Sequence, residues 1–440
     1  MDKKIIAGIV IACSVIAGLF IGLSDGSYIK VETNSDKLIS KNSGDVLSGE
    51  NPSGNALFSG DSSGDIITPD EPVTPPESDS PIIDTSHSSP STQSSSKQIP
   101  ESVKAVYATG WVMGSKGPRD SMITLIKENG YNAVVIDIKD EAGQLSYNSS
   151  VQTAIDINAS RKMISNVEAV IKELKENDIY VIGRIVTFKD PIYASKVNSI
   201  AYKKSDGSIW KDSAGNCWPN PYNRETWKYP LELAKEAAKL GFEEIQFDYI
   251  RFPSSEGKVS NISYGFDYGT TKKADIISSF LEEAMKELAP YNVVVSADVF
   301  GITTKRDGDF ENIGQDFSRI AGIVDVICPM VYPSHYYYNE YKIAVPDKNP
   351  YEIVYYSLED AFERIESYIS GDTTKKVAKI RPYFQDFTAT WLGKGNYIVY
   401  GTEEVKKQIQ ASYDLGIKDF CLWDPSNKYC YPALKQVKEN

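Results

Sequence analysis

Blocks of hydrophobic and polar residues alternate regularly from residue 101 to the end of the chain. Eight apolar runs predict β-strands at 105–110, 133–138, 180–188, 244–252, 293–301, 324–332, 377–383 and 419–423. Seven segments with helical spacing lie between them, at 121–129, 163–177, 226–240, 275–288, 311–321, 358–369 and 402–415. Several of these segments end as Asn129-Gly130-Tyr131 does, which is typical of a helix that stops before the next strand.

The alternation of strands and helices predicts a parallel sheet in an α/β fold. Eight such units in residues 101–440 fit a (β/α)8 TIM barrel with enlarged loops, and we predict this fold. An open, doubly wound sheet is the alternative, but no Gly-rich phosphate-binding turn follows the first strand. In a barrel, the residues at the carboxyl ends of the strands form the active face.

The first 23 residues form a separate segment. Lys3 and Lys4 precede an uncharged apolar run, Ile5–Leu23, whose 19 residues are long enough to cross a bilayer. The basic end predicts a single-pass cell-membrane protein whose C-terminal domain is extracytoplasmic. We therefore expect a signal anchor. A cleaved signal peptide, which would make the protein secreted, and a lipoprotein signal at Cys13 are the alternatives.

Residues 24–100 predict a disordered tether. They are rich in Ser, Gly, Pro, Thr and Asp, and they contain twelve acidic against four basic residues. Such a segment cannot bury enough apolar surface to offset the entropy lost on ordering. Much of the formal net charge of −13 therefore lies in the tether. Because no basic face is indicated, we expect no nucleic-acid partner. We expect a monomer.

Few residues of the folded region suit metal or nucleophile chemistry. Its one histidine is His335, because His87 falls in the tether. No nucleophile-elbow motif accompanies His335, which argues against a Ser-His-Asp hydrolase. Cys328 and Cys421 lie in apolar runs and are predicted to be buried, whereas the disulfide state of all four cysteines in this region stays open. No close Cys pair or Cys/His cluster occurs, so we expect neither a metal nor another cofactor.

Carboxylates dominate the predicted active face. Asp248 follows the apolar residues of the fourth run, where an unpaired buried acid would be costly, so we predict that Asp248 is catalytic. Arg251 is its expected partner or a substrate clamp. Asp298 follows the apolar stretch 293–295 of the fifth run and is the second predicted catalytic acid. Paired carboxylates, one of them protonating the leaving oxygen, are the machinery of glycoside hydrolysis.

Further polar and aromatic residues are predicted to surround this pair. The expected substrate-binding residues, besides Arg251, are Asp137, Lys139, Arg184, Tyr332, His335, Trp111 and Trp423. Arg184, on the neighbouring strand, is also expected to hold Asp248 ionised. Aromatic faces suit sugar rings, which need apolar platforms with polar rims. For Asp137, Asp298 and His335, a structural role is about as good an interpretation.

Three motifs resemble a known family. Residues 248–253 (DYIRFP), 296–301 (SADVFG) and 330–336 (MVYPSHY) are similar to the glycosyl-hydrolase barrel domains of bacterial surface proteins, first catalogued as a domain of unknown function. The resemblance covers about residues 103–434. It implies a TIM barrel distantly related to the α-amylase and α-galactosidase groups, in which an aspartate that ends strand four is the nucleophile, here Asp248. Amylase-like relatives use a glutamate at the end of strand five, where this chain has the shorter Asp298.

These observations predict an extracytoplasmic glycoside hydrolase that acts on a polysaccharide of the cell envelope or its surroundings. The alternative is a non-catalytic carbohydrate-binding or wall-organising barrel, which would need the aromatic platform but not two placed acids. Trp210 and Trp218, in the long segment 193–223, either bind sugar or pack that segment onto the barrel.

Overall fold

Parallel strands close into a barrel in the computed structural model, which describes residue 97 and residues 99–254, 262–264, 269–305 and 312–438. The barrel strands are β1 (Lys104–Ala108), β2 (Ala133–Lys139), β3 (Tyr180–Val186), β5 (Glu244–Asp248), β7 (Val294–Phe300), β8 (Val326–Met330), β9 (Lys379–Ile380), β10 (Tyr383–Gln385) and β11 (Phe420–Trp423). The predicted membrane anchor lies outside the described residues, as does the predicted tether apart from Lys97, Ile99 and Pro100.

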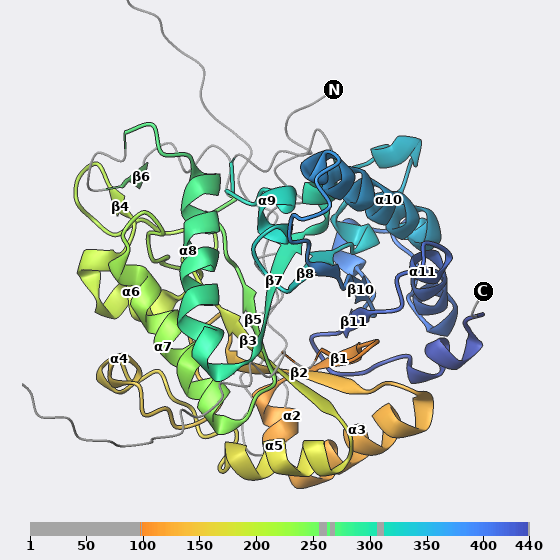
Figure 1. The fold of residues 1–440 in the computed structure, drawn as a ribbon, viewed down its shortest axis with the longest axis horizontal. Coiled ribbons are helices and arrows are strands. Elements are labelled where there is room, and N and C mark those ends of the chain that lie inside the picture. The colour runs from red at the N-terminus through yellow and green to blue at the C-terminus, as the bar shows by residue number, and fades with distance from the viewer. Residues whose placement is uncertain (1–96, 98, 255–261, 265–268, 306–311, 439–440) are drawn as a thin grey trace, which may run out of the picture. The chain divides into compact units, whose positions relative to one another are not determined.

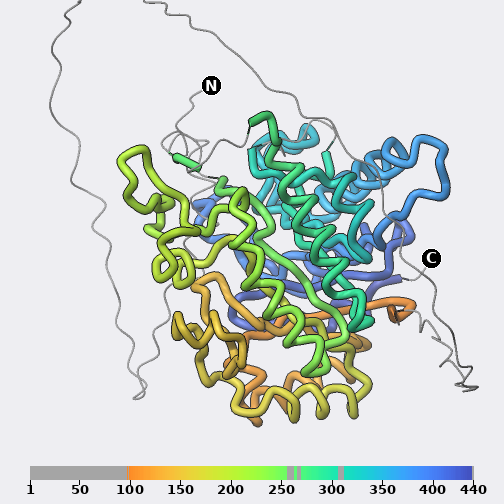
Figure 2. The backbone as a smooth tube through the Cα atoms, turned by 60° about the vertical axis from the view of Figure 1, so that its left-hand side comes forward, coloured from red at the N-terminus to blue at the C-terminus, as the bar shows by residue number. Residues whose placement is uncertain are grey.

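Neighbouring strands follow the chain order, and β1 pairs with both β2 and β11. Strands β9 and β10 together occupy one position, because β9 pairs with β8 while β10 pairs with β8 and β11. Between them lie Arg381 and Pro382, and proline has no N–H to donate to a ladder. Counting β9 and β10 once gives eight strands, so the predicted TIM barrel is confirmed for the described residues. Figure 2 follows the chain around this barrel until its first and last strands meet.

Helices surround the strands (Figure 1). The longer ones are α3 (Lys116–Asn129), α5 (Val167–Glu176), α7 (Glu225–Leu240), α8 (Lys273–Leu288), α10 (Pro350–Ile369) and α11 (Thr402–Asp414). Short helices are α2 (Gly110–Gly114), α4 (Gln152–Asp156), α6 (Pro191–Lys196) and α9 (Phe317–Ala321). The predicted segment 311–321 is helical only in α9, while α10 begins eight residues before the predicted start at 358, with proline in its first position.

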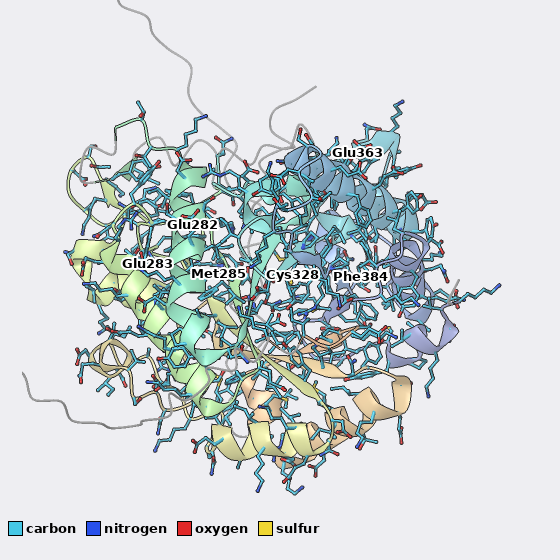
Figure 3. The ribbon with its side chains drawn as sticks, in the orientation of Figure 1. Glu282, Glu283, Met285, Cys328, Glu363 and Phe384 are labelled. Carbon is cyan, nitrogen blue, oxygen red and sulfur yellow. The ribbon has the colours of Figure 1, made fainter. Side chains whose placement is uncertain are left out.

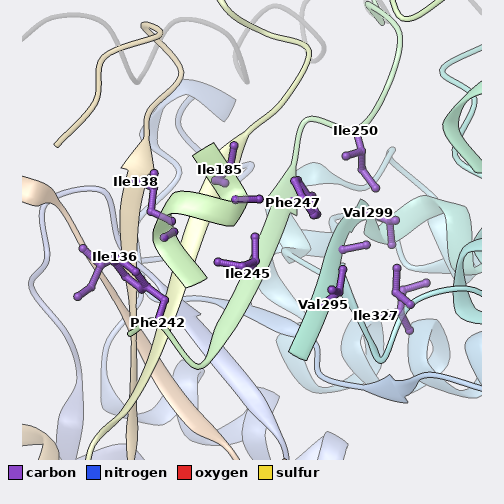
Figure 4. Packing of buried hydrophobic residues seen from close by; sticks show 14 of the residues in the cluster. Ile136, Ile138, Ile185, Phe242, Ile245, Phe247, Ile250, Val295, Val299 and Ile327 are labelled. Carbon is purple, nitrogen blue, oxygen red and sulfur yellow. The ribbon is translucent and has the colours of Figure 1, made fainter. Parts of the chain in front are cut away.

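Alternate residues of each strand face opposite sides and form two apolar layers. One layer lies between strands and helices, where Ile245 and Phe247 of β5 pack near Val295 and Val299 of β7 (Figure 4). The other fills the barrel and includes Cys328, which lies near the middle of the molecule, away from Glu282 and Glu283 on α8 (Figure 3). Cys328 and Cys421 are fully buried, as predicted, and the four described cysteines are unpaired thiols.

Polar groups also occur deep in the barrel. Arg381 donates to Glu244 over 2.7 Å, and both side chains are fully buried. Above this pair, the Tyr383 hydroxyl donates to Gln246 over 2.7 Å. These contacts fill the barrel interior below the carboxyl ends of the strands. Those strand ends and the residues that follow them form the mouth of the barrel, and the chemistry must lie there.

The long segment after β3 covers part of that mouth. Its β4 (Lys203–Lys204) pairs antiparallel with β6 (Ile262–Ser263). Trp210 and Trp218 are 2% and 3% exposed, and the Trp218 indole donates to Asp212 over 2.9 Å. Both tryptophans therefore pack this segment in the structure. In the part of the chain described here, no helix is both long and apolar enough to cross a membrane.

Candidate active site

Arg184 is the centre of the mouth. It lies in the inward-facing row of β3, and its guanidinium donates to three carboxylates at once. The Nη1 atom donates to Asp137 over 2.6 Å, and Nη2 donates to Glu141 over 2.5 Å and to Asp248 over 2.6 Å. Arg184 is 1% exposed. Burial opposes its charge, but Glu141, Asp248 and Asp137 together raise the pKa of Arg184 well above its ordinary value.

Asp248 and Asp298 occupy neighbouring positions on adjacent strands. The register of β5 and β7 pairs Gln246 with Ser296 and Phe247 with Ala297. One residue further along each strand, Asp248 therefore lies opposite Asp298. Neighbouring strands lie about 4.8 Å apart. Both side chains belong to the inward-facing rows, and Asp248 and Asp298 are 5% and 1% exposed. The two predicted catalytic acids are therefore side by side at the mouth.

The two acids differ in environment. The Oδ2 atom of Asp248 accepts two hydrogen bonds from Arg184, at 2.6 and 3.0 Å, and its Oδ1 accepts from the backbone N–H of Tyr249. In contrast, the buried Oδ1 of Asp298 has no hydrogen-bond partner among the described residues. Burial, together with the negative charge of Asp248, raises the pKa of Asp298 well above its ordinary value. Asp298 thus favours its protonated form more than an exposed aspartate does, and it lies beside a carboxylate paired with arginine.

Tyr107 and Trp423 form one wall of the mouth. Their rings stack with centroids 4.0 Å apart, and the Arg184 guanidinium lies 5.0 Å from the Trp423 ring centroid. The Tyr107 hydroxyl donates a short, 2.5 Å hydrogen bond to Asp137. Burial raises the pKa of Asp137 to about 6, although Arg184 and Tyr107 both favour its charged form.

Replacing Tyr107 by phenylalanine is expected to raise the pKa of Asp137 above about 6. The carboxylate would lose its hydrogen bond from the hydroxyl while its burial is kept. A ¹³C NMR titration of the Asp137 carboxyl carbon measures this directly. A Tyr351→Phe variant is the control, because that hydroxyl binds Asp414 on the exterior. An unchanged or lower pKa of Asp137 would contradict the expectation.

A second aromatic group follows β8 and β10. Tyr332 packs edge-on against His335 and Phe387, at centroid distances of 5.2 and 5.7 Å. Phe387 stacks on Trp391 at 5.7 Å. Burial, then the charges of Asp298 and Asp248, raises the pKa of Tyr332, which places its hydroxyl near the acids. The structure thus brings Tyr332 and His335 to the mouth, where substrate binding by them stays a prediction.

Three other predicted substrate-binding residues lie apart from Arg184 and the carboxylates that it binds. Lys139 is fully buried and donates to Asp190 over 2.6 Å, because the register shifts between Asp137 and Lys139. Arg251 is not the ion-pair partner of Asp248; its guanidinium lies 4.6–5.1 Å from the ring centroids of Phe300, Tyr249 and Trp218. Trp111, on α2, is 63% exposed and is free to meet a ligand. Substrate contacts by these three stay predictions.

Sequence reasoning missed several residues of the mouth. Glu141 lies three residues beyond the second predicted strand and was not predicted as a site residue, although it accepts a hydrogen bond from Arg184. Tyr107 was hidden inside an apolar run, but its alternation with Ala105 places it on the inward row. Phe387 and Trp391 lie beyond the strand end, where no periodicity indicated their direction. Within the described ranges, no group of three acidic, His or Cys side chains has the arrangement of a metal site.

The fold and the mouth define a class: a (β/α)8 barrel of the glycoside hydrolase type, with acids and aromatic rings at the carboxyl ends of its strands. Within this class, the chain belongs to the family described as "Putative glycosyl hydrolase domain", whose profile matches residues 105–429. The family resemblance drawn from the three motifs is thereby confirmed.

The chain resembles several solved structures. The PgaB (BpsB) glycoside hydrolase domain from Bordetella bronchiseptica is 13% identical and has a TM-score of 0.54, covering 76% of this chain and 98% of that one. This likeness shows the shared fold. A hypothetical protein from Ruminiclostridium thermocellum ATCC 27405 is 41% identical, with a TM-score of 0.41, covering 44% of this chain and 97% of that one. No curated protein sequence matches the chain.

Proposed function

We propose that this barrel hydrolyses glycosidic bonds with Asp298 as the acid and Asp248 as the carboxylate that meets the anomeric carbon. The observation that carries the proposal is the contrast between adjacent acids. Asp248 is bound by Arg184, whereas Asp298 is buried without a hydrogen bond to Oδ1 in the described structure and has a raised pKa. Environments that separate the pKa values of two carboxyl groups assign an acid and a base.

The proposed reaction uses the neutral Asp298 first. Its proton passes to the glycosidic oxygen as the bond from that oxygen to the anomeric carbon breaks. Asp248, fixed by Arg184, either attacks the anomeric carbon or stabilises its positive charge. Water then supplies a hydroxyl to that carbon and returns a proton to Asp298. The protein's own carboxyl groups thus account for every proton moved.

The proposed substrate is a polysaccharide of the cell envelope or its surroundings. The aromatic rings of Tyr107, Trp423, Tyr332 and Phe387 border the acids and suit the faces of sugar rings. Attachment to the membrane by residues 1–23, with the barrel on the outer side, would keep the enzyme near such a polymer. This location belongs to the proposal and follows from the basic, apolar N-terminal sequence.

The proposal is tested with the purified full-length chain, wild type beside Asp248→Asn. Both are incubated with envelope and exopolysaccharide fractions, and new reducing ends are counted over time. We expect release by the wild type and much slower release by the variant, since the amide cannot carry the charge. Asp120→Asn, at an exposed surface ion pair, is the control and is expected to keep full activity.

Two other results would contradict parts of the proposed function. Equal release by the wild type and Asp248→Asn would remove Asp248 from the reaction. Retention of polysaccharide without release by either protein would favour the non-catalytic binding barrel, to which the exposed Trp111 offers an aromatic face.

A further inference from the structure

Lys189 is brought to the mouth by an extension of the β3–β5 pairing. Beyond the strands, the Thr187 N–H donates to the Asp248 carbonyl over 2.8 Å and the Phe188 N–H donates to the Tyr249 carbonyl over 3.2 Å. Lys189 follows directly, and its Nζ lies 4.9 Å from the Tyr249 ring centroid. Tyr249 has a φ of 49°, an uncommon left-handed conformation for a bulky residue. Such backbone strain is concentrated at functional sites.

The same tyrosine ring lies close to two cations. Arg251 approaches its centroid to 4.8 Å, a distance similar to that of Lys189. Burial lowers the pKa of Lys189; the charge of Glu141 opposes this shift, and the charge of Arg251 adds to it. A substrate group that brings negative charge to this point would therefore be favoured over a neutral or cationic one.

The Lys189 ammonium has no acceptor within the described structure. The side chain is 3% exposed and carries three N–H donors, yet it makes neither a hydrogen bond nor an ion pair there. Nearby acids are engaged elsewhere: Glu141 and Asp248 accept from Arg184, and Asp212 accepts from Trp218. Because the mostly buried side chain holds its ammonium at the mouth without a hydrogen-bonded partner in the described structure, we infer that the ligand supplies that partner.

We propose that Lys189 binds a carboxylate group of the substrate, so that the polysaccharide contains acidic sugars. The inference rests on the proposed function, whose substrate class it narrows. A carboxylate would accept charge-assisted hydrogen bonds from Lys189 and so supply the acceptor that its ammonium lacks in the described structure. A hydroxyl would supply an acceptor without charge, and a protonated amino sugar would be repelled at this position.

Binding is measured in the full-length Asp298→Asn protein, so that retention does not depend on turnover. The probes are the acidic and neutral pools of envelope and exopolysaccharide, together with the acidic pool after chemical reduction of its carboxyl groups to alcohols. We expect the acidic pool to bind and its carboxyl-reduced form to bind about tenfold or more weakly. Equal binding of the two forms, binding of the neutral pool alone, or no binding of the acidic pool would overturn the inference.

Single substitutions test whether Lys189 is the residue that binds the acidic pool. Adding Lys189→Gln to the Asp298→Asn protein is expected to weaken binding of the acidic pool about tenfold or more. Adding Lys189→Arg instead is expected to keep most of the affinity. Lys172→Gln, at an exposed position of α5, is the control and should change nothing. Unchanged affinity in folded Lys189→Gln would overturn the role of this lysine, and the carboxyl-reduction experiment needs no lysine variant.

The proposed hydrolysis and the proposed carboxylate binding by Lys189 can be contradicted independently. If the acidic pool binds through Lys189 but the wild type releases no reducing ends from it, the substrate-binding role stands and hydrolysis falls. If the wild type hydrolyses carboxyl-reduced chains as fast as acidic ones, hydrolysis stands and the role of Lys189 falls.

Discussion

Replacing Arg184 by methionine is expected to lower the free energy of unfolding by about 3–5 kcal/mol, because it removes one partner of a buried ion-pair network. The side chain of Arg184 is 1% exposed, and those of Asp137 and Asp248 are 5% and 7% exposed. Without the guanidinium, three neighbouring carboxyl groups lose their shared cation. Arg184 lowers the pKa values of Asp137 and Glu141, which would therefore rise in the variant, so the deficit should shrink as the pH falls and these two groups become neutral.

Urea unfolding of the wild type and Arg184→Met at pH 7 and pH 5 measures both effects. Arg319→Met is the matched control, because its ion pair with Asp275 has side chains 41% and 43% exposed. Such a surface pair contributes about 0–1 kcal/mol. A loss at Arg184 no larger than the loss at Arg319, or a deficit that grows on acidification, would contradict the network described here.

Replacing Asp298 by asparagine is expected to have opposite effects on activity and stability. Loss of the acid should slow hydrolysis by about 10²–10⁴-fold. The fold should gain stability at neutral pH, since a buried group with a raised pKa favours its neutral form and asparagine is always neutral. Asp120→Asn, on the surface, should change neither quantity appreciably.

The sign of the pH effect follows from the direction of the pKa shift. In the unfolded chain Asp298 loses its proton near pH 4, whereas the folded protein retains it to higher pH. Between these two pKa values, rising pH favours unfolding, by about 1.4 kcal/mol per pH unit from this group. Unfolding free energies from pH 4 to pH 8 should therefore diverge in favour of Asp298→Asn. A constant difference across this range would show that Asp298 titrates normally.

The sequence predicted the barrel because its strands are buried on both faces and read as continuous apolar runs. Its errors were local. The fourth predicted strand ran to 252, but β5 ends at Asp248, where Tyr249 turns to a positive φ. The seventh was predicted as one run, 377–383, and is divided at Arg381 and Pro382. Neither a strained residue nor the tertiary contacts that support it leave a periodic signal.

Part of the site was also readable in advance. Strand order placed Arg184 next to Asp248, and the structure joins them. The contacts of Arg251 and Lys139 could not be predicted from the sequence. A positive φ at Tyr249 and a register shift between Asp137 and Lys139 change the direction in which these side chains point. Lys189 directly follows the third predicted strand and was not predicted as a site residue. Its lack of an acceptor depends on which partners engage the nearby acids, and that is a property of the folded mouth alone.

The central claim is that Asp248 and Asp298 act as a unit on one glycosidic bond. The most direct test is reducing-end release by four full-length proteins: wild type, Asp248→Asn, Asp298→Asn and the double variant. Residues that act as a unit are strongly non-additive, so the double variant should lose no more activity than the worse single variant. Losses that multiply in the double variant, or a single variant as active as the wild type, would contradict the claim.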